Sequence, residues 1–220
     1  MLERLLPVTV SISESRGDIL DATLFPEEEE MIGGAVEKRR REFATGRACA
    51  RRALAELGVA PQPIIPGPGG APWWPPGILG SITHCEGYRA CAVARDTDLL
   101  AIGIDAEPNR PLPPGLIADI ALERESAWVG RLMRERPEVH WDRLLFCMKE
   151  AIYKAWFPRT GRALGFEDAI VSVDPAGGTF SARLATPDRA SLGEETTVLR
   201  GSWIVGEGIA LAAIAIGRRS

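Results

Sequence analysis

The feature that most restricts the fold of this chain is a stretch rich in proline and glycine. Residues 61–80, PQPIIPGPGGAPWWPPGILG, contain too much of both for a helix or an interior strand. A connection of about 20 residues without regular structure is usually functional or disordered in a compact domain. Because Trp73 and Trp74 lie within it, we expect an ordered loop that takes part in function.

Helical patterns precede this loop. Pro26, followed by four glutamates, predicts the start of a short helix. Gly58 ends a longer apolar pattern that begins near residue 37, and Gly46 within it costs about 1 kcal/mol relative to alanine, so a kink there is an alternative. The apolar residues at helical spacing are Phe43, Ala50, Leu54 and Leu57.

The same order, a helix followed by strands, recurs later in the chain. Residues 8–12 alternate like a short strand, and residues 89–95 and 99–105 are predicted to be two paired strands. A second long helix is expected from 141 to 157, ended by Pro158. Four further strands are expected at residues 169–173, 179–184, 197–205 and 209–216.

This order predicts an α+β fold with two subdomains, each with a long helix packed on a small antiparallel sheet. The proline-rich residues 108–116 are the expected linker. The N-terminal half then covers residues 1–107, including the strand that ends in GIDAE, and the C-terminal half covers 117–220.

Charge and cysteine content exclude several functional classes. A net charge of −4 argues against a dedicated nucleic-acid-binding protein. No run of about 18 apolar residues exists to span a membrane, and the N-terminus lacks a signal-peptide pattern, so a cytoplasmic protein is expected. The cysteines lack CxxC spacing, which favours reduced thiols over disulfides or a zinc site; they are Cys49, Cys85, Cys91 and Cys147.

Two carboxylates at the end of an apolar strand form the sharpest motif. Asp105 and Glu107 are two residues apart, so on a strand they point to the same face. They repel each other unless a cation lies between them, and hard oxygen ligands favour magnesium or calcium. The alternative is a solvated strand end before a turn at Pro108.

A second charged pair lies on the predicted C-terminal helix. Glu150 and Lys154 are four residues apart and share one helix face. Such a pair is most often an ordinary surface ion pair. Here aromatic residues flank it on both sides, which predicts a cleft instead; these are Phe146, Tyr153, Trp156 and Phe157.

Two further segments offer phosphate-binding groups. Residues 80–84, GSITH, place two hydroxyls and an imidazole after a glycine, although a lone histidine is more often structural. The basic run at residues 38–41, together with Arg47, provides guanidinium groups that pair well with phosphate, although such a run is usually a solvated face. Arg40 shares a helix stripe with Arg47, and Arg39 lies about 80° round the helix from it.

In this order, the segments resemble the 4'-phosphopantetheinyl transferases of the larger, monomeric type that serve siderophore and other secondary-metabolite pathways. The resemblance covers roughly residues 40 to 168. Four ordered motifs are specific where each alone is weak. The matching stretches are residues 39–52 (RRREFATGRACARR), 74–94 (WPPGILGSITHCEGYRACAVA), 102–108 (IGIDAEP) and 140–158 (HWDRLLFCMKEAIYKAWFP).

The resemblance implies two similar halves related by pseudo-twofold symmetry, with coenzyme A in the cleft between them. Asp105, Glu107 and Glu150 would hold Mg²⁺, with Mn²⁺ as the alternative, against the diphosphate, and Lys154 would contact the diphosphate beside them. Residues matching the family's other coenzyme A contacts, at the nucleotide end and along the cleft, are Arg39, Arg47, Ser81, Thr83, His84 and Leu164, with Arg40 replacing Arg39 if the register differs by one.

The resemblance also implies the reaction. Phosphopantetheine would pass from coenzyme A to a serine of an apo acyl or peptidyl carrier protein, which would dock near residues 111–140, and adenosine 3',5'-bisphosphate would leave. Glu150 would be the general base, and Lys154 and Asp105 would assist. One departure concerns the loop at residues 64–71, which lacks the lysine that relatives commonly place there. The rival functions are a non-catalytic coenzyme A-binding module and a nucleic-acid-binding adaptor.

Overall fold

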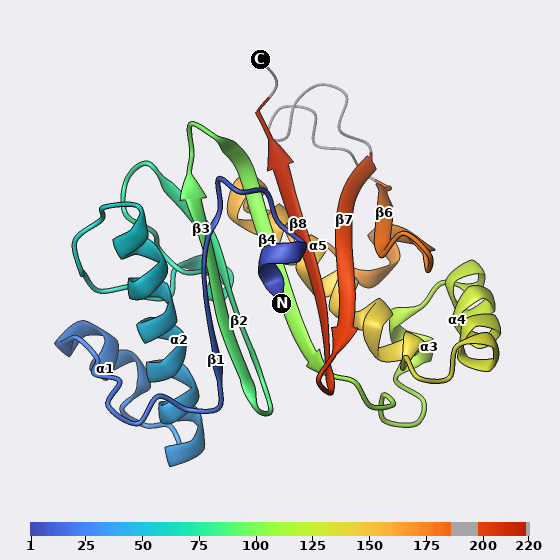
Figure 1. Ribbon diagram of the computed structural model, residues 1–220, viewed down its shortest axis with the longest axis horizontal. Coiled ribbons are helices and arrows are strands. Elements are labelled where there is room, and N and C mark those ends of the chain that lie inside the picture. Colours follow the sequence, from blue (N-terminus) through green and yellow to red (C-terminus); the bar gives the residue numbers. More distant parts are fainter. Residues whose placement is uncertain (186–197, 219–220) are drawn as a thin grey trace.

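Two antiparallel sheets lie side by side in the computed structural model, which describes residues 1–185 and 198–218 (Figure 1). The first sheet has the order β1-β3-β2 and the second has the order β4-β8-β7-β6-β5. Helix α2 packs on the first sheet, and α5 packs on β4 and β8 of the second. The predicted α+β fold with two similar subdomains is confirmed.

The elements have the following bounds. The first sheet consists of β1 (Ser11–Arg16), β2 (Ile78–Cys85) and β3 (Tyr88–Arg95). The second consists of β4 (Leu99–Pro108), β5 (Ala169–Asp174), β6 (Thr179–Leu184), β7 (Val198–Gly206) and β8 (Ile209–Gly217). The helices are α1 (Pro26–Ile32), α2 (Glu37–Glu56), α3 (Ile117–Ile120), α4 (Glu123–Glu135) and α5 (Trp141–Thr160), with 3-10 turns η1 (Leu2–Arg4), η2 (Pro68–Gly70) and η3 (Phe166–Asp168).

Both long helices extend as continuous elements. Helix α2 runs through Gly46 without a break, and the helix face at Gly46 lies against Ile82 of β2. Helix α5 continues past Pro158, which was expected to end it, and stops at Gly161. Gly161 has a φ of 65°, the left-handed conformation that glycine adopts most readily at a helix end. The glycine, not the proline, therefore ends α5.

The pairing of β4 differs from the expectation. The sequence predicted that β4 would pair with β3 and belong to the N-terminal half, but β4 pairs with β8 as an edge of the second sheet. β3 pairs with β1 and β2. The division between the sheets therefore falls in the turn between β3 and β4, earlier than the expected boundary after residue 107. Neighbouring apolar strands do not by themselves determine which long-range partner each one takes.

Side-chain hydroxyls join the two sheets where β2 and β4 meet. Ile104 N donates to Ser81 Oγ at 3.2 Å, and Ala106 N donates to Thr83 Oγ1 at 3.0 Å. In a continuous sheet these amides would donate to carbonyl groups of the neighbouring strand. The hydroxyls satisfy the amides of β4, so the two sheets touch along this line, which we call the seam, without sharing a backbone ladder.

Each half contains a buried glutamate with equivalent bonds. Glu28 in α1 accepts from Phe25 N, from Ile64 N beyond the long helix, and from Arg51 of α2. Glu125 in α4 shows the same arrangement, with bonds from Leu122 N, from Val171 N and from Lys149 of α5. Both glutamates are 0% exposed. The repeated arrangement supports an internal relationship that the sequence alone does not reveal.

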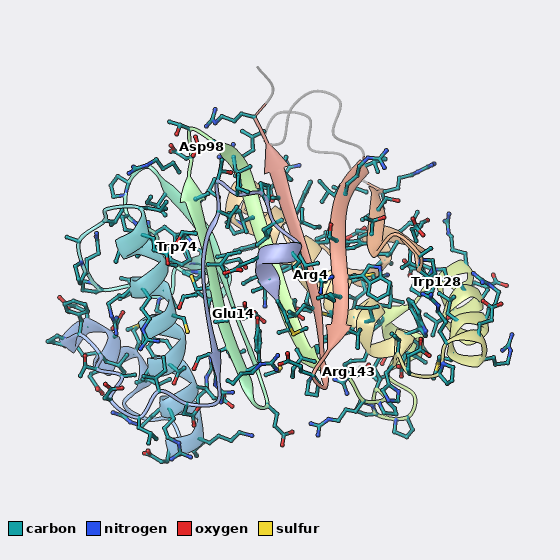
Figure 2. The ribbon with its side chains drawn as sticks, in the orientation of Figure 1. Arg4, Glu14, Trp74, Asp98, Trp128 and Arg143 are labelled. Atoms are coloured by element: carbon teal, nitrogen blue, oxygen red, sulfur yellow. The ribbon has the colours of Figure 1, made fainter. Side chains whose placement is uncertain are left out.

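Apolar side chains form separate clusters around the two sheets (Figure 2). The largest lies between the second sheet and α4 and α5, and includes Trp141, Trp156 and Trp203. A second joins the two sheets under η1, and a third lies between α2 and the first sheet, where Trp74 packs. Among the helices of the described residues, none has the length and apolar character that crossing a membrane requires.

Candidate active site

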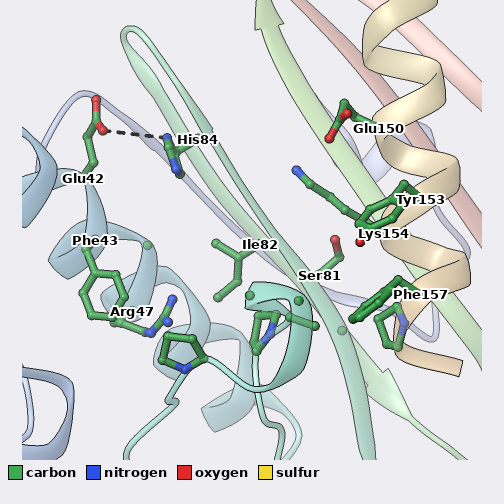
Figure 3. A pocket seen from close by; sticks show the side chains of 18 of the residues that line it. Glu42, Phe43, Arg47, Ser81, Ile82, His84, Glu150, Tyr153, Lys154 and Phe157 are labelled. Atoms are coloured by element: carbon green, nitrogen blue, oxygen red, sulfur yellow. Dashed lines mark ion pairs between the residues drawn. The ribbon is translucent and has the colours of Figure 1, made fainter. Parts of the chain in front are cut away.

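A cavity of about 400 Å³ lies between the two halves (Figure 3). Helix α2 and strand β2 line it on one side, α5 lines it on the other, and the proline- and glycine-rich loop contributes residues that include Gly69 and Gly70. The loop was expected to take part in function, and its position at the cavity is consistent with that expectation. The cavity brings together residues that lie more than a hundred positions apart in the sequence.

Helix α5 approaches β4 closely because of Gly103. A β-carbon added at Gly103 would lie 2.6 Å from Ala155 N, and closer still to Ala151 O. Strand alternation places Asp105 on the same face of β4 as Gly103. The missing side chain therefore lets the helix backbone reach the strand next to the carboxylate.

Asp105 is buried beside this contact, 5% exposed. Its Oδ1 accepts from Lys154 Nζ at 2.6 Å and from Thr83 Oγ1 at 3.1 Å. Its Oδ2 is buried and has no hydrogen-bond partner among the described residues. A buried acceptor left unpaired is costly, so this oxygen is a candidate ligand-binding atom.

Glu150 and Lys154 lie on the cavity side of α5 (Figure 3). Burial and the charge of Asp105 raise the pKa of Glu150. Burial alone would lower the pKa of Lys154, but the adjacent Asp105 outweighs it, with a further contribution from Glu150, so the pKa is raised and the ammonium stays charged. The predicted pair therefore lies at a cleft, next to a third charged group.

Glu107 is paired with an arginine that the sequence did not single out. Arg143 of α5 donates to Glu107 Oε2 at 2.9 Å and to the carbonyl of Pro111 at 3.0 Å (Arg143 is labelled in Figure 2). Burial and the charge of Asp105 raise the pKa of Glu107, and Arg143 acts in the opposite direction. Arg143 thus neutralises this carboxylate in the structure.

The donor chemistry of the three acidic residues fits a hard divalent cation. All three are carboxylates, and burial together with the charge of Asp105 raises the pKa of both glutamates. Within the described residues, Asp105 Oδ2 has no partner. Within residues 1–185 and 198–218, however, no three His, Cys, Asp or Glu side chains are already arranged as a metal site. The described arrangement therefore presents acidic donors that are near one another but not assembled around an ion.

The opposite end of the cavity is basic. Arg47 is 6% exposed, donates to Ile64 O at 2.6 Å, and lies over the Phe43 ring. Burial lowers the pKa of Arg47 to about 10, so it still carries its charge at neutral pH. Arg39 Nη1 lies 2.6 Å from His84 Nε2; arginine can only donate, so the ring nitrogen accepts. Burial, and then Arg39, lower the pKa of His84.

The structure distinguishes the two candidate arginines. Arg39 lines the cavity, whereas Arg40 pairs with Glu29 at 2.6 Å and donates to Ile32 O at 3.2 Å. The Arg40 guanidinium is thus directed toward α1. The geometry therefore favours Arg39 over Arg40 as a cavity residue.

The remaining sequence-predicted residues differ in their positions. Ser81 lines the cavity as well as the seam. Thr83 is 1% exposed and is not among the cavity-lining residues. Leu164 packs, partly buried, against the core of the C-terminal half, and it too is outside the cavity lining.

Glu42 was not predicted as a site residue from the sequence, and Tyr153 and Phe157 were predicted only as aromatic residues that flank the charged pair. Tyr153 and Phe157 stack with ring centroids 5.4 Å apart and line the cavity, as does Glu42 of α2. The signal was present for the aromatic pair, because positions 150, 153, 154 and 157 share one helix face. Glu42 had no comparable signal, since its place opposite His84, 3.9 Å from Nδ1, depends on how α2 packs on β2.

Charge is divided across the cavity. The N-terminal half supplies Arg39, Arg47 and the neutral imidazole of His84, which suit an anionic group and outnumber Glu42 on the same side. The C-terminal half supplies Glu150 and Lys154, and Lys154 is paired with the buried Asp105, which suits a second anion accompanied by a cation and a proton acceptor. Such a cavity can hold a ligand with two separated phosphate groups and carry out chemistry at one of them.

Comparisons with known proteins agree with this geometry. The 4'-phosphopantetheinyl transferase N-terminal domain matches residues 27–94, and the 4'-phosphopantetheinyl transferase superfamily matches residues 101–206. The 4'-phosphopantetheinyl transferase Svp of Streptomyces mobaraensis is 48% identical over 219 residues, which cover 98% of this chain and 89% of the relative. The boundary between the two matches falls close to the turn between the sheets.

Two further relatives match over almost their whole length. The 4'-phosphopantetheinyl transferase Npt of Nocardia iowensis is 45% identical over 223 residues, 98% of this chain and 99% of the relative. The 4'-phosphopantetheinyl transferase PptT of Mycobacterium tuberculosis is 45% identical over 224 residues, 98% of each. On these matches, the chain belongs to the 4'-phosphopantetheinyl transferase family of enzymes.

Proposed function

We propose that this chain transfers the 4'-phosphopantetheine group of coenzyme A to a serine hydroxyl of an apo acyl or peptidyl carrier protein. The observation that carries the proposal is the division of charge in the cavity. Coenzyme A has a 3'-phosphate at its nucleotide end and a diphosphate further along. The basic end of the cavity suits the first, and Lys154 beside Asp105 and Glu150 suits the second.

The nucleotide end would be bound by the N-terminal half. Arg39 and Arg47 would pair with the 3'-phosphate, and His84 and Ser81, which also line the cavity, would contact the same end. The loop lacks the lysine found in relatives, but its glycines line the cavity, and their small size lets backbone amides approach a phosphate. Leu164 stays a candidate for the pantetheine side of the cleft.

A divalent cation completes the proposed site. Asp105, Glu107 and Glu150 would hold Mg²⁺, or Mn²⁺ in its place. When bound, such an ion neutralises the charge that develops on diphosphate oxygens during phosphoryl transfer. The unpaired Asp105 Oδ2 supports this assignment, as do the raised pKa values of the two glutamates.

The chemistry follows from the positions of Glu150 and Lys154. Glu150 would accept the proton of the carrier serine, directly or through one water, as the serine oxygen forms a bond to the phosphorus next to pantetheine. The bond between this phosphorus and the bridging diphosphate oxygen breaks, and adenosine 3',5'-bisphosphate leaves with the bonding electrons. Lys154, whose raised pKa keeps it charged, would stabilise the departing phosphate.

The carrier protein would dock beside the cavity, and residues 111–140 are the proposed platform. Leu116 and Met133 are exposed there, while Trp128 donates to Val171 O at 3.3 Å and belongs more to the core. We propose a monomeric enzyme in the cytoplasm that serves a secondary-metabolite or siderophore pathway. The four cysteines are buried free thiols, as a reducing compartment allows.

The test is the intact mass of an apo carrier protein after incubation with this enzyme, coenzyme A and Mg²⁺. We expect a gain of one phosphopantetheine per carrier serine, and the formation of adenosine 3',5'-bisphosphate in equal amount. A carrier in which the serine is replaced by alanine is the control. Binding of coenzyme A without any gain in carrier mass would contradict the proposal and favour a non-catalytic binding module.

A further inference from the structure

Thr83 lies at the seam between the two sheets, and its hydroxyl is fully engaged. Oγ1 donates to Asp105 Oδ1 at 3.1 Å and accepts from Ala106 N at 3.0 Å. A hydroxyl has one proton to donate, so the proton given to Asp105 is not available to a phosphate. Thr83, like Asp105 itself, is not among the residues that line the cavity, and the two meet just behind Lys154, which does line it. The geometry of Thr83 therefore serves the carboxylate and not the nucleotide.

Asp105 is held by both halves of the molecule at once. Thr83 of β2 and Lys154 of α5 both bind Oδ1, the latter at 2.6 Å. Two donors on one oxygen fix the plane of the carboxylate. The other oxygen, Oδ2, is buried and has no hydrogen-bond partner in the part of the chain that the structure describes. The carboxylate is thus held in one orientation, with Oδ2 the oxygen that these two donors leave unbound.

We propose that Thr83 is a positioning residue for the transfer reaction, which orients Asp105 so that Oδ2 is presented to the divalent cation. This inference rests on the proposed function, because it takes Asp105 as a ligand of the ion. Hydrogen bonds that orient metal ligands typically change metal affinity by about 10- to 100-fold. Because Thr83 belongs to one half and Asp105 to the other, the affinity for the cation would depend on the contact between the halves.

The test measures Mn²⁺ binding by electron paramagnetic resonance. Coenzyme A is saturating and the carrier is omitted, so that no transfer occurs. Thr83→Val removes the hydroxyl but keeps the branched shape, and we expect it to weaken Mn²⁺ binding by about 10-fold. Thr83→Ser keeps the hydroxyl and should stay within about twofold of the wild type. If Thr83→Val does not fold, Thr83→Ala replaces it, since a water can then reach Ala106 N.

Ser81→Ala provides a matched control. Ser81 Oγ accepts from Ile104 N at the same seam and, among the described residues, has no hydrogen bond to a carboxylate. Ser81 is also a proposed contact of the nucleotide end, so coenzyme A is kept saturating for this variant as well. Under that condition we expect Ser81→Ala to lose thermal stability, as Thr83→Val does, but to bind Mn²⁺ like the wild type. Equal weakening in both variants would overturn the inference, because the cause would then be a loosened seam. Wild-type affinity in the variant that lacks the Thr83 hydroxyl would overturn it directly.

Activity gives a second reading of the same variants. A misoriented Asp105 should raise the Mg²⁺ concentration needed for half-maximal transfer in Thr83→Val, and high Mg²⁺ should restore kcat. A kcat that stays low at saturating Mg²⁺ would contradict a positioning role. Failure of the wild type to bind Mn²⁺ at all would overturn the cation assignment in the proposed function, and the inference with it, so the two failures are distinguishable.

Discussion

Glu28 in the N-terminal half and Glu125 in the C-terminal half carry out the same structural task with different cations. Each lies in the first turn of a short helix and binds an amide beyond the following long helix. Glu28 pairs with Arg51, which is 15% exposed and also donates to Thr23 O. Glu125 pairs with Lys149, which is 2% exposed. Each half thus contains an equivalent buried glutamate, which we call its anchor. The two anchors differ in how deeply the paired cation is buried.

The halves differ more in what they bring to the cavity. The N-terminal half contributes Arg39, Arg47 and His84, together with Glu42. The C-terminal half contributes Glu150 and Lys154, and Lys154 is paired with Asp105 behind it. One half therefore offers charges suited to holding an anion, and the other offers groups suited to a chemical step. The comparison predicts that changes in the first half act mainly on KM for coenzyme A, and changes in the second mainly on kcat.

The largest effect is expected from Asp105→Ala in the C-terminal half. The change removes the ion-pair partner of Lys154 and the unpaired oxygen proposed as a metal ligand. We expect kcat to fall by about 1,000-fold or more, which corresponds to about 4 kcal/mol of transition-state stabilisation. The measurement is carrier modification by mass spectrometry, with circular dichroism to show that the fold persists. Near-normal turnover would break the assignment of chemistry to this half.

The packing of the long helices gives the second test. Gly103→Ala would place a β-carbon against the backbone of α5, 2.6 Å from Ala155 N, so the helix must move away from Asp105. We expect destabilisation of about 3 kcal/mol and a fall in kcat. In the N-terminal half, a β-carbon at Gly46 would meet Ile82 at an ordinary 3.5 Å. Gly46→Ala should therefore be tolerated, with a gain of up to about 1 kcal/mol from helix propensity.

Thermal unfolding of the two glycine variants makes this comparison directly. Each variant is the control for the other, since both replace glycine by alanine at a buried contact between helix and sheet. The result is the difference between their melting temperatures. Equal stability of Gly103→Ala and Gly46→Ala would show that close backbone approach does not distinguish the C-terminal half.

The two buried glutamates give a third, paired prediction. Burial lowers the pKa of Lys149, and Glu125→Gln removes the carboxylate that opposes this shift. Among the described residues, the lysine keeps two carbonyl oxygens as acceptors, so we expect a loss of about 3 kcal/mol. Glu28→Gln should cost less, about 2 kcal/mol, because Arg51 keeps its bond to Thr23 O and reaches water. Denaturant unfolding of both variants measures the difference. A larger loss for Glu28→Gln would reverse the ranking of the two anchors.

The fourth prediction concerns the basic end of the cavity. Arg39→Gln should raise KM for coenzyme A by about 10-fold, which corresponds to about 1.4 kcal/mol, with little change in kcat. The matched substrate is 3'-dephospho-coenzyme A, for which the wild type and the variant should have similar KM values. Arg40→Gln serves as the control variant, since Arg40 pairs with Glu29 outside the cavity. If Arg39→Gln raises KM for 3'-dephospho-coenzyme A as much as it raises KM for coenzyme A, Arg39 does not bind the 3'-phosphate.

The smallest expected effect is a pH dependence from His84. Its pKa is lowered in the folded protein by burial and by Arg39, so the unfolded chain binds a proton more readily. His84 therefore contributes to the free energy of unfolding above the unfolded pKa of about 6.5, and this contribution is lost as pH falls below that value. His84→Asn should flatten this part of the curve of melting temperature against pH. An unchanged curve would show that His84 contributes nothing to acid sensitivity.

The sequence predicts the local elements of this fold well. The periodic apolar pattern gives α2 and most of α5, and Pro26 gives the start of α1. The pairing of β4 could not be predicted, because its partner β8 lies a hundred residues away and adjacent apolar strands suggest each other first. Glu28 and Glu125 show why the internal relationship is hidden: a single glutamate in an equivalent bonding position is too short a signal to align.

The candidate site was predictable as a set of residue types but not as an arrangement. Asp105, Glu150 and Lys154 meet as the spacing and the family resemblance imply. Thr83 was expected to contact the nucleotide, since a hydroxyl shortly after a glycine is a group that can donate a hydrogen bond to phosphate. Which hydroxyl faces the cavity depends on how β2 lies against β4, and that contact is made only in the folded chain.

The central claim is that one coenzyme A molecule spans both halves, and a crystal structure with coenzyme A and Mg²⁺ tests it most directly. The account predicts the 3'-phosphate within hydrogen-bond distance of Arg39 and Arg47, and the diphosphate beside Lys154 with the ion bound to Asp105 Oδ2. Density for coenzyme A on any other surface, or in this cavity with its diphosphate remote from Asp105, would contradict the account.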